Sequence, residues 1–113
     1  MTEAKEIEAK FKTFYVTPKK AKIPVDGTTT VIKVSGTIQS TNKNKKVNIT
    51  LTFPNGKVKH QQPAPYAETA TSNIYNFEWM YGVAKGSEIG TYKVQAVLEE
   101  NPSEKRSDTF EVS

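Results

Sequence analysis

The chain has 113 residues, of which 35% are hydrophobic and 25% charged, and a chain of this length and composition folds as one domain around one core. It contains no cysteine, which excludes disulfides and leaves the redox compartment undetermined. The 16 basic and 12 acidic residues give a formal net charge of +4, which suits an anionic partner only if the lysines gather on one surface.

Residues 1–10 are expected to form a flexible or weakly helical extension, in which Ile7 and Phe11 make an i, i+4 apolar pair. So short a helix is marginal by itself. Residues 11–113 are expected to form the single folded domain. No apolar run in the chain is long enough for a signal-peptide core. The polar run after Met1 also fits a boundary from which a leader or membrane anchor was removed.

The first apolar segment, residues 14–25, contains Pro18 and Pro24. Proline cannot donate to a central ladder, so this strand is expected at a sheet edge, either broken or switching between sheets.

Five later segments alternate apolar and polar residues, as strands with one buried face do. Their apolar members are Ile32, Val34, Gly36 and Ile38; Val47, Ile49, Leu51 and Phe53; Tyr75, Phe77, Trp79 and Tyr81; Tyr92, Val94, Ala96 and Leu98; and Phe110 and Val112.

Two local features refine this pattern. Gly36 lacks a side chain, so we expect a gap on the core face that a large ring such as Trp79 fills. Pro54-Asn55-Gly56 is typical of a tight turn and predicts a hairpin. Residues 61–73 have no periodicity and are expected to form a long surface loop or a short irregular edge strand.

About seven short strands without helices predict an all-β protein, a two-sheet antiparallel β-sandwich. The segments that carry a family resemblance are Tyr-Val-Thr-Pro (15–18), Val-Asp-Gly (25–27), Ile-Lys-Val-Ser-Gly-Thr-Ile (32–38), Val-Asn-Ile-Thr-Leu-Thr-Phe-Pro-Asn-Gly (47–56), Gly-Thr-Tyr-Lys-Val-Gln-Ala (90–96) and Thr-Phe-Glu-Val (109–112). Their order resembles extracellular immunoglobulin-like modules of archaeal and bacterial surface-layer proteins, adhesins and filament-associated proteins, and is also similar to macroglobulin-type domains.

The resemblance covers residues 14–112 and implies an immunoglobulin-like sandwich without an inter-sheet disulfide, located outside the cell or at its surface. It also implies that Tyr92 buries its ring and returns its hydroxyl to a nearby backbone group, as in a tyrosine corner.

No pattern of catalytic residues is recognisable. The single histidine, His60, has no nucleophile or orienting acid near it in the sequence, and the acidic residues are not arranged as a carboxylate pair. Ligand clusters for metals and glycine-rich phosphate loops are likewise missing. We therefore expect no catalytic, cofactor-binding or metal-binding residues, and a protein that is not an enzyme.

A protein of this kind acts through its surface. The candidate partner contacts are short lysine groups and side chains beside the aromatic strand: Lys43, Lys45, Lys46, Lys57, Lys59, Tyr66 and Met80. Only one of the 16 basic residues is arginine, the residue preferred for bidentate phosphate and base contacts, which argues against nucleic acid.

Three functions remain open. The leading hypothesis is a non-catalytic extracellular or cell-surface module that binds another surface protein, or itself as a homo-oligomer, through a sheet edge or face. The first alternative is a carbohydrate-binding sandwich. The second is a basic nucleic-acid-binding β protein that uses residues 43–46 and 57–59. A membrane would be reached only through a segment outside this chain.

Overall fold

The alternating segments form β-strands, and of their apolar members only Phe53 lies just past the end of its strand. The structure is a computed structural model that describes residues 8–113, apart from the side chains of His60 and Gln61. The predicted extension over residues 1–10 thus lies mostly outside the described residues. Within residues 8–113, no segment forms a helix able to cross a membrane.

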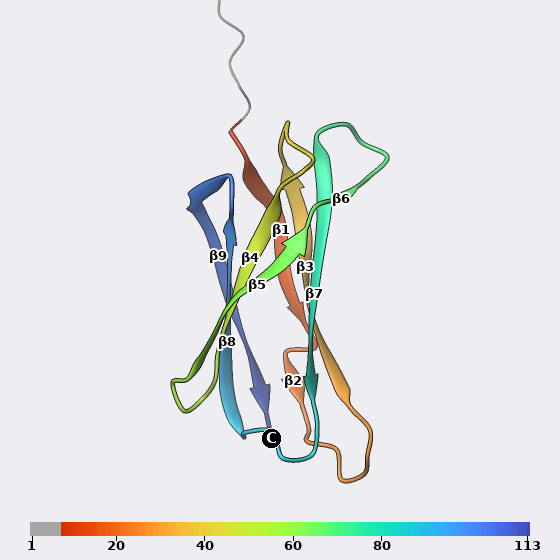
Figure 1. The fold of residues 1–113 in the computed structure, drawn as a ribbon. Helices are drawn as coiled ribbons and strands as arrows, with labels where there is room; N and C mark the ends of the chain where they lie inside the picture. Colours follow the sequence, from red (N-terminus) through yellow and green to blue (C-terminus); the bar gives the residue numbers. More distant parts are fainter. Residues whose placement is uncertain (1–7) are drawn as a thin grey trace, which may run out of the picture.

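Nine strands follow one another along the chain (Figure 1). They are β1 (Lys10–Thr17), β2 (Lys20–Ala21), β3 (Thr30–Gln39), β4 (Lys46–Thr52), β5 (Val58–Pro65), β6 (Ala67–Glu68), β7 (Ile74–Val83), β8 (Gly90–Leu98) and β9 (Asn101–Val112).

The strands form two sheets that pack face to face. Sheet A has the order β1-β3-β7-β6, and sheet B has the order β2-β9-β8-β4-β5. The inward positions of both sheets bury an apolar core whose largest fully buried side chains include Tyr92, Phe110 and Ile32. Two sheets whose inner faces interdigitate are the defining feature of a sandwich.

The proline-marked first segment is split between the sheets. β1 lies at the edge of sheet A, antiparallel to β3, and its ladder ends at Thr17. Pro18 has no N–H with which to continue that ladder. The chain crosses to sheet B, where β2 pairs with β9 in parallel. Sheet B is therefore mixed, and the prediction of purely antiparallel sheets was wrong at this edge.

The Pro54-Asn55-Gly56 turn joins β4 to β5. Phe53 N donates to Lys57 O at 2.8 Å, and Gly56 adopts a positive φ of 89°. This turn defines what we call the hairpin end of the sandwich. The opposite end carries the β3–β4 and β8–β9 turns (Figure 1).

Residues 61–73 were expected to form a long surface loop or a short irregular edge strand, and the first half of the segment is edge strand. β5 continues to Pro65 and is followed by the short β6. β5 tolerates its prolines because it is the outermost strand of sheet B, so one side of its backbone needs no partner.

Gly36 does not leave space for Trp79. A Cβ at Gly36 would lie 2.2 Å from Thr13 O and 2.9 Å from Cε1 of Phe77, so β1 and the Phe77 ring already occupy the gap. Trp79 is opposite Val34 and stacks on Tyr81, with ring centroids 6.3 Å apart.

Candidate functional site

The candidate lysines lie at two separate places. Lys43, Lys45 and Lys46 lie at the opposite end, whereas Lys57 and Lys59 follow the hairpin turn. β4 separates the two groups, because it begins at Lys46 and ends at Thr52 before the hairpin turn, a distance of about 20 Å at about 3.3 Å per residue. The structure therefore does not bring them into one patch.

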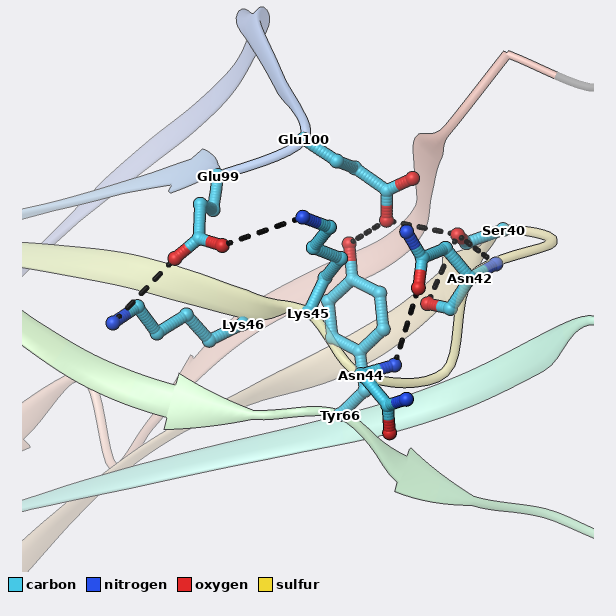
Figure 2. Close-up of polar contacts among 8 residues, drawn as sticks. All are labelled: Ser40, Asn42, Asn44, Lys45, Lys46, Tyr66, Glu99 and Glu100. Carbon is cyan, nitrogen blue, oxygen red and sulfur yellow. Dashed lines mark hydrogen bonds and ion pairs between the residues drawn. The ribbon is translucent and has the colours of Figure 1, made fainter.

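The lysines at the opposite end are neutralised by carboxylates (Figure 2). Lys45 and Lys46 are 3.9 and 3.5 Å from the two carboxylate oxygens of Glu99. Lys43 is 4.0 Å from Glu68. Exposed pairs of this kind contribute little stability, but they cancel most of the positive potential that an anionic ligand would need.

Tyr66 is not an exposed partner contact, contrary to the prediction. Its side chain is 8% exposed, and its hydroxyl donates to Oε2 of Glu100 at 2.6 Å (Figure 2). Burial, reinforced by the hydrogen bond and the negative charge of Glu100, raises the pKa of the Tyr66 phenol above its usual range. Its surroundings are buried because β5 carries the chain across the sandwich into β6 (Figure 1).

The same carboxylate holds a second turn. Ser40 Oγ donates to Oε2 of Glu100 at 2.8 Å and accepts from Asn42 N at 3.0 Å. Ser40, Tyr66 and Glu100 thus fix the β3–β4 turn, the β5–β6 junction and the β8–β9 turn to one another. We call them the Glu100 cluster. Its role follows from pairing between distant segments, and no local sequence signal identifies Ser40 or Glu100.

The outer face of sheet B has a different character. Alternate residues of β4 and β8 are buried in the core, so the residues between them face outward. The residues of β9 that pair with the outward residues of β8 face the same way. Strand pairing arranges nine of these in three rows: Asn48, Val97 and Lys105; Thr50, Gln95 and Ser107; Thr52, Lys93 and Thr109. We call these nine residues the sheet B face.

The sheet B face contains two lysines and no carboxylate. Lys93 and Lys105 are exposed, and neither makes an ion pair within residues 8–113. Lys57 and Lys59 are also exposed and unpaired in the described part of the chain, but they are not on this face. Lys59 is opposite Leu51, which is buried in the core, and Lys57 is opposite Phe53, which packs against the core. The nearest outward carboxylate on β9 is Glu111, in the row beyond Thr109.

Sequence reasoning missed Lys93 and Lys105 because each is isolated in the chain. Only the pairing of β8 with β9, which puts Val97 opposite Lys105 and Lys93 opposite Thr109, places them on one surface. The alternation of apolar and polar residues in β8 did indicate that Lys93 faces outward. It did not indicate which residues of β9 lie opposite those of β8.

The single arginine is directed elsewhere. The Arg106 guanidinium lies 5.6 Å from the centroid of the Phe11 ring and 3.5 Å from the Glu104 carboxylate. It belongs to the inward-facing set of β9 and does not contribute to the sheet B face.

The remaining predicted residues lie apart from that face. Met80 is 52% exposed on the outer face of sheet A. Tyr92 is fully buried, and its hydroxyl donates to Glu88 O at 2.7 Å. Among the described residues, no group of three or more acidic, histidine or cysteine side chains is placed to hold a metal ion.

No family model and no curated protein matches the chain. A solved structure with a similar fold is the Pseudomonas fluorescens alkylpurine DNA glycosylase AlkC bound to DNA containing an abasic site analog, with a TM-score of 0.56 and 18% sequence identity. The match covers 97% of this chain and 31% of that chain.

At this identity the likeness shows a shared fold, and this chain spans less than a third of the matched protein. The matched architecture belongs to a DNA-bound enzyme rather than to a surface-layer protein or an adhesin. The predicted function, a non-catalytic module of the cell surface, was therefore wrong.

Proposed function

We propose that this domain binds nucleic acid, specifically the backbone of duplex DNA, through the sheet B face. One observation carries the proposal. Strand pairing places Lys93 and Lys105, neither of them in an ion pair, beside hydroxyl and amide side chains, and none of the nine residues of this face is a carboxylate. Nucleic acid was ranked as the last alternative because most lysines are dispersed in the sequence and only one basic residue is arginine. Dispersion in the sequence does not show which lysines strand pairing brings together.

The side chains of the face suit phosphate. Lysine, threonine, serine, asparagine and glutamine are among the residues that contact phosphate and sugar oxygens. Thr109 of β9 is opposite Lys93 of β8. It lies four positions from Lys105 along β9, a distance of about 13 Å at about 3.3 Å per residue. That distance matches the rise of about four nucleotides in one DNA strand.

The preference for a duplex follows from the lack of aromatic side chains on the sheet B face. Single-stranded nucleic acid is held by stacking of bases on exposed aromatic rings. None of the nine residues of the sheet B face is aromatic. Lysine also lacks the bidentate geometry with which arginine reads guanine. The proposed binding is therefore independent of sequence and depends on salt.

The structural neighbour supports the same class of ligand, since that protein is bound to DNA. Because this chain matches 31% of that protein, we propose that the domain supplies DNA contacts and no reacting group of its own.

We also propose that the sandwich is a variant of the immunoglobulin-like class. The order β1-β3-β7-β6 corresponds to strands A-B-E-D of that class, and β9-β8-β4-β5 to strands G-F-C-C′. The bond from the Tyr92 hydroxyl to Glu88 O supports it, because a tyrosine corner has this form.

The experiment that tests DNA binding is a fluorescence anisotropy titration with a labelled duplex of about 20 base pairs and a single strand of equal length, at several salt concentrations. We expect the duplex to bind at least about tenfold more tightly. We also expect log K to fall with log salt with a slope of about −2, as phosphate contacts by Lys93 and Lys105 require. Absence of duplex binding at low salt, or binding unaffected by salt, would contradict the proposal.

A further inference from the structure

One edge of sheet A lacks a neighbouring strand over most of its length. β7 pairs with β3 along its whole length, from Ile74 to Val83. On its other side, β6 pairs only with Tyr75 and Asn76 (Figure 1). Among the described residues, no strand pairs with that side of β7 from Phe77 to Val83. We call this segment the open edge.

The other sheet edges carry features that prevent further pairing. β5 contains Pro63 and Pro65, and β1 has a register shift between Phe11 and Thr13. β2 is only two residues long. Prolines, bulges and short strands are the usual protections of an edge.

The open edge has none of these protections. It contains no proline, and its register with β3 is continuous. Its one charged residue, Glu78, is 3.4 Å from Lys33 of the neighbouring strand. An unprotected flat edge with little net charge is a template for another strand.

Apolar side chains flank the open edge on both faces of the sheet. Met80 is 52% exposed on the outer face. On the inner face, Trp79 and Tyr81 are only partly buried, and their rings stack 6.3 Å apart. A strand added here would bury apolar area as well as pair backbone groups.

We propose that a second copy of this chain pairs antiparallel with the open edge, about a two-fold axis through Met80. Residues directly opposite each other in a sheet point to the same face. In two copies of the same strand, opposite residues must therefore both have odd numbers or both have even numbers. Phe77 and Val83, the limits of the open edge, are then opposite each other in the two copies. Any other register either meets β6 or leaves part of the edge unpaired.

This register is self-complementary in chemistry. Trp79 faces Tyr81 of the partner subunit, an aromatic pair that occurs twice by symmetry. Met80 faces Met80 of the partner subunit on the outer face. Glu78 faces Gly82 of the partner subunit, so no like charges oppose each other. Aromatic cross-strand pairs stabilise a sheet, and opposed like charges destabilise it. An unrelated peptide has no reason to match this pattern.

The test is sedimentation velocity from about 1 µM to about 1 mM, with the emission of Trp79 followed over the same range. Trp79 is the one tryptophan of the chain, so its fluorescence reports directly on the edge. We expect a monomer–dimer equilibrium and an emission maximum that moves to shorter wavelength as the dimer forms. A monomer throughout this range would overturn the proposal.

Two matched variants locate the interface. Met80→Lys puts two like charges on the two-fold axis and should raise the dimer Kd by at least about tenfold. Val31→Lys is the control, because Val31 is 48% exposed on the same outer face but lies on β3. Circular dichroism verifies that both variants fold. A dimer that survives Met80→Lys, or that Val31→Lys weakens equally, would contradict pairing through β7.

Discussion

At the scale of single residues, Tyr66 illustrates what a lone sequence conceals. A tyrosine that follows two prolines in an aperiodic segment looks like a surface residue, yet its hydroxyl belongs to the Glu100 cluster. Its hydrogen bond joins residues 34 positions apart. Local pattern carries no information about such a partner, because the pairing depends on how β5 crosses the sandwich.

Tyr66→Phe removes that hydrogen bond. Because the acceptor is a carboxylate, we expect the free energy of unfolding to fall by about 1.5–3 kcal/mol, measured by urea denaturation. Tyr15→Phe is the control, since Tyr15 is 51% exposed, and it should change stability by less than about 0.5 kcal/mol. Equal effects of the two changes would mean that the cluster does not hold the turns.

Alkaline pH tests the buried phenols together. Burial raises the pKa of Tyr92 from 10.0 to about 12, and that of Tyr66 shifts in the same direction. Above pH 10 the unfolded chain loses phenol protons that the folded chain keeps, so the unfolding free energy should fall between pH 10 and about 12. Urea denaturation across this range measures it. The fall should be shallower in Tyr66→Phe; an unchanged slope would contradict a raised pKa of Tyr66.

At the scale of elements, the strands were predictable and their partners were not. The side-chain alternation of Val47 to Leu51 or Tyr92 to Leu98 is a local property, since each residue's face depends only on its neighbours. The parallel pairing of β2 with β9, and the rows of the sheet B face, depend on contacts between distant segments.

Gly36 tests the packing of β1 on β3. Gly36→Ala places a Cβ 2.2 Å from Thr13 O, so β1 must move, and we expect a loss of about 1–3 kcal/mol in thermal or urea unfolding. Gly27→Ala is the matched control, because a Cβ there meets no atom within 4 Å. If both substitutions were equally tolerated, β1 would not be packed against Gly36 as described.

At the scale of the whole molecule, the distribution of charge matters more than its sum. The lysines that cluster in the sequence, Lys43, Lys45 and Lys46, are paired with Glu68 and Glu99. Lys93 and Lys105 are dispersed in the sequence but share a surface without carboxylates. The net charge of +4 therefore understates the positive character of one face and overstates that of the opposite end.

The central claim, that DNA binds the sheet B face, is tested most directly by duplex affinity in two double variants of equal charge. Lys93→Ala/Lys105→Ala should raise Kd by at least about tenfold and make the salt slope shallower by about two. Lys33→Ala/Lys43→Ala removes two ion-paired lysines from elsewhere and should leave Kd within about twofold. Equal losses in both double variants, or none in the first, would contradict the claim.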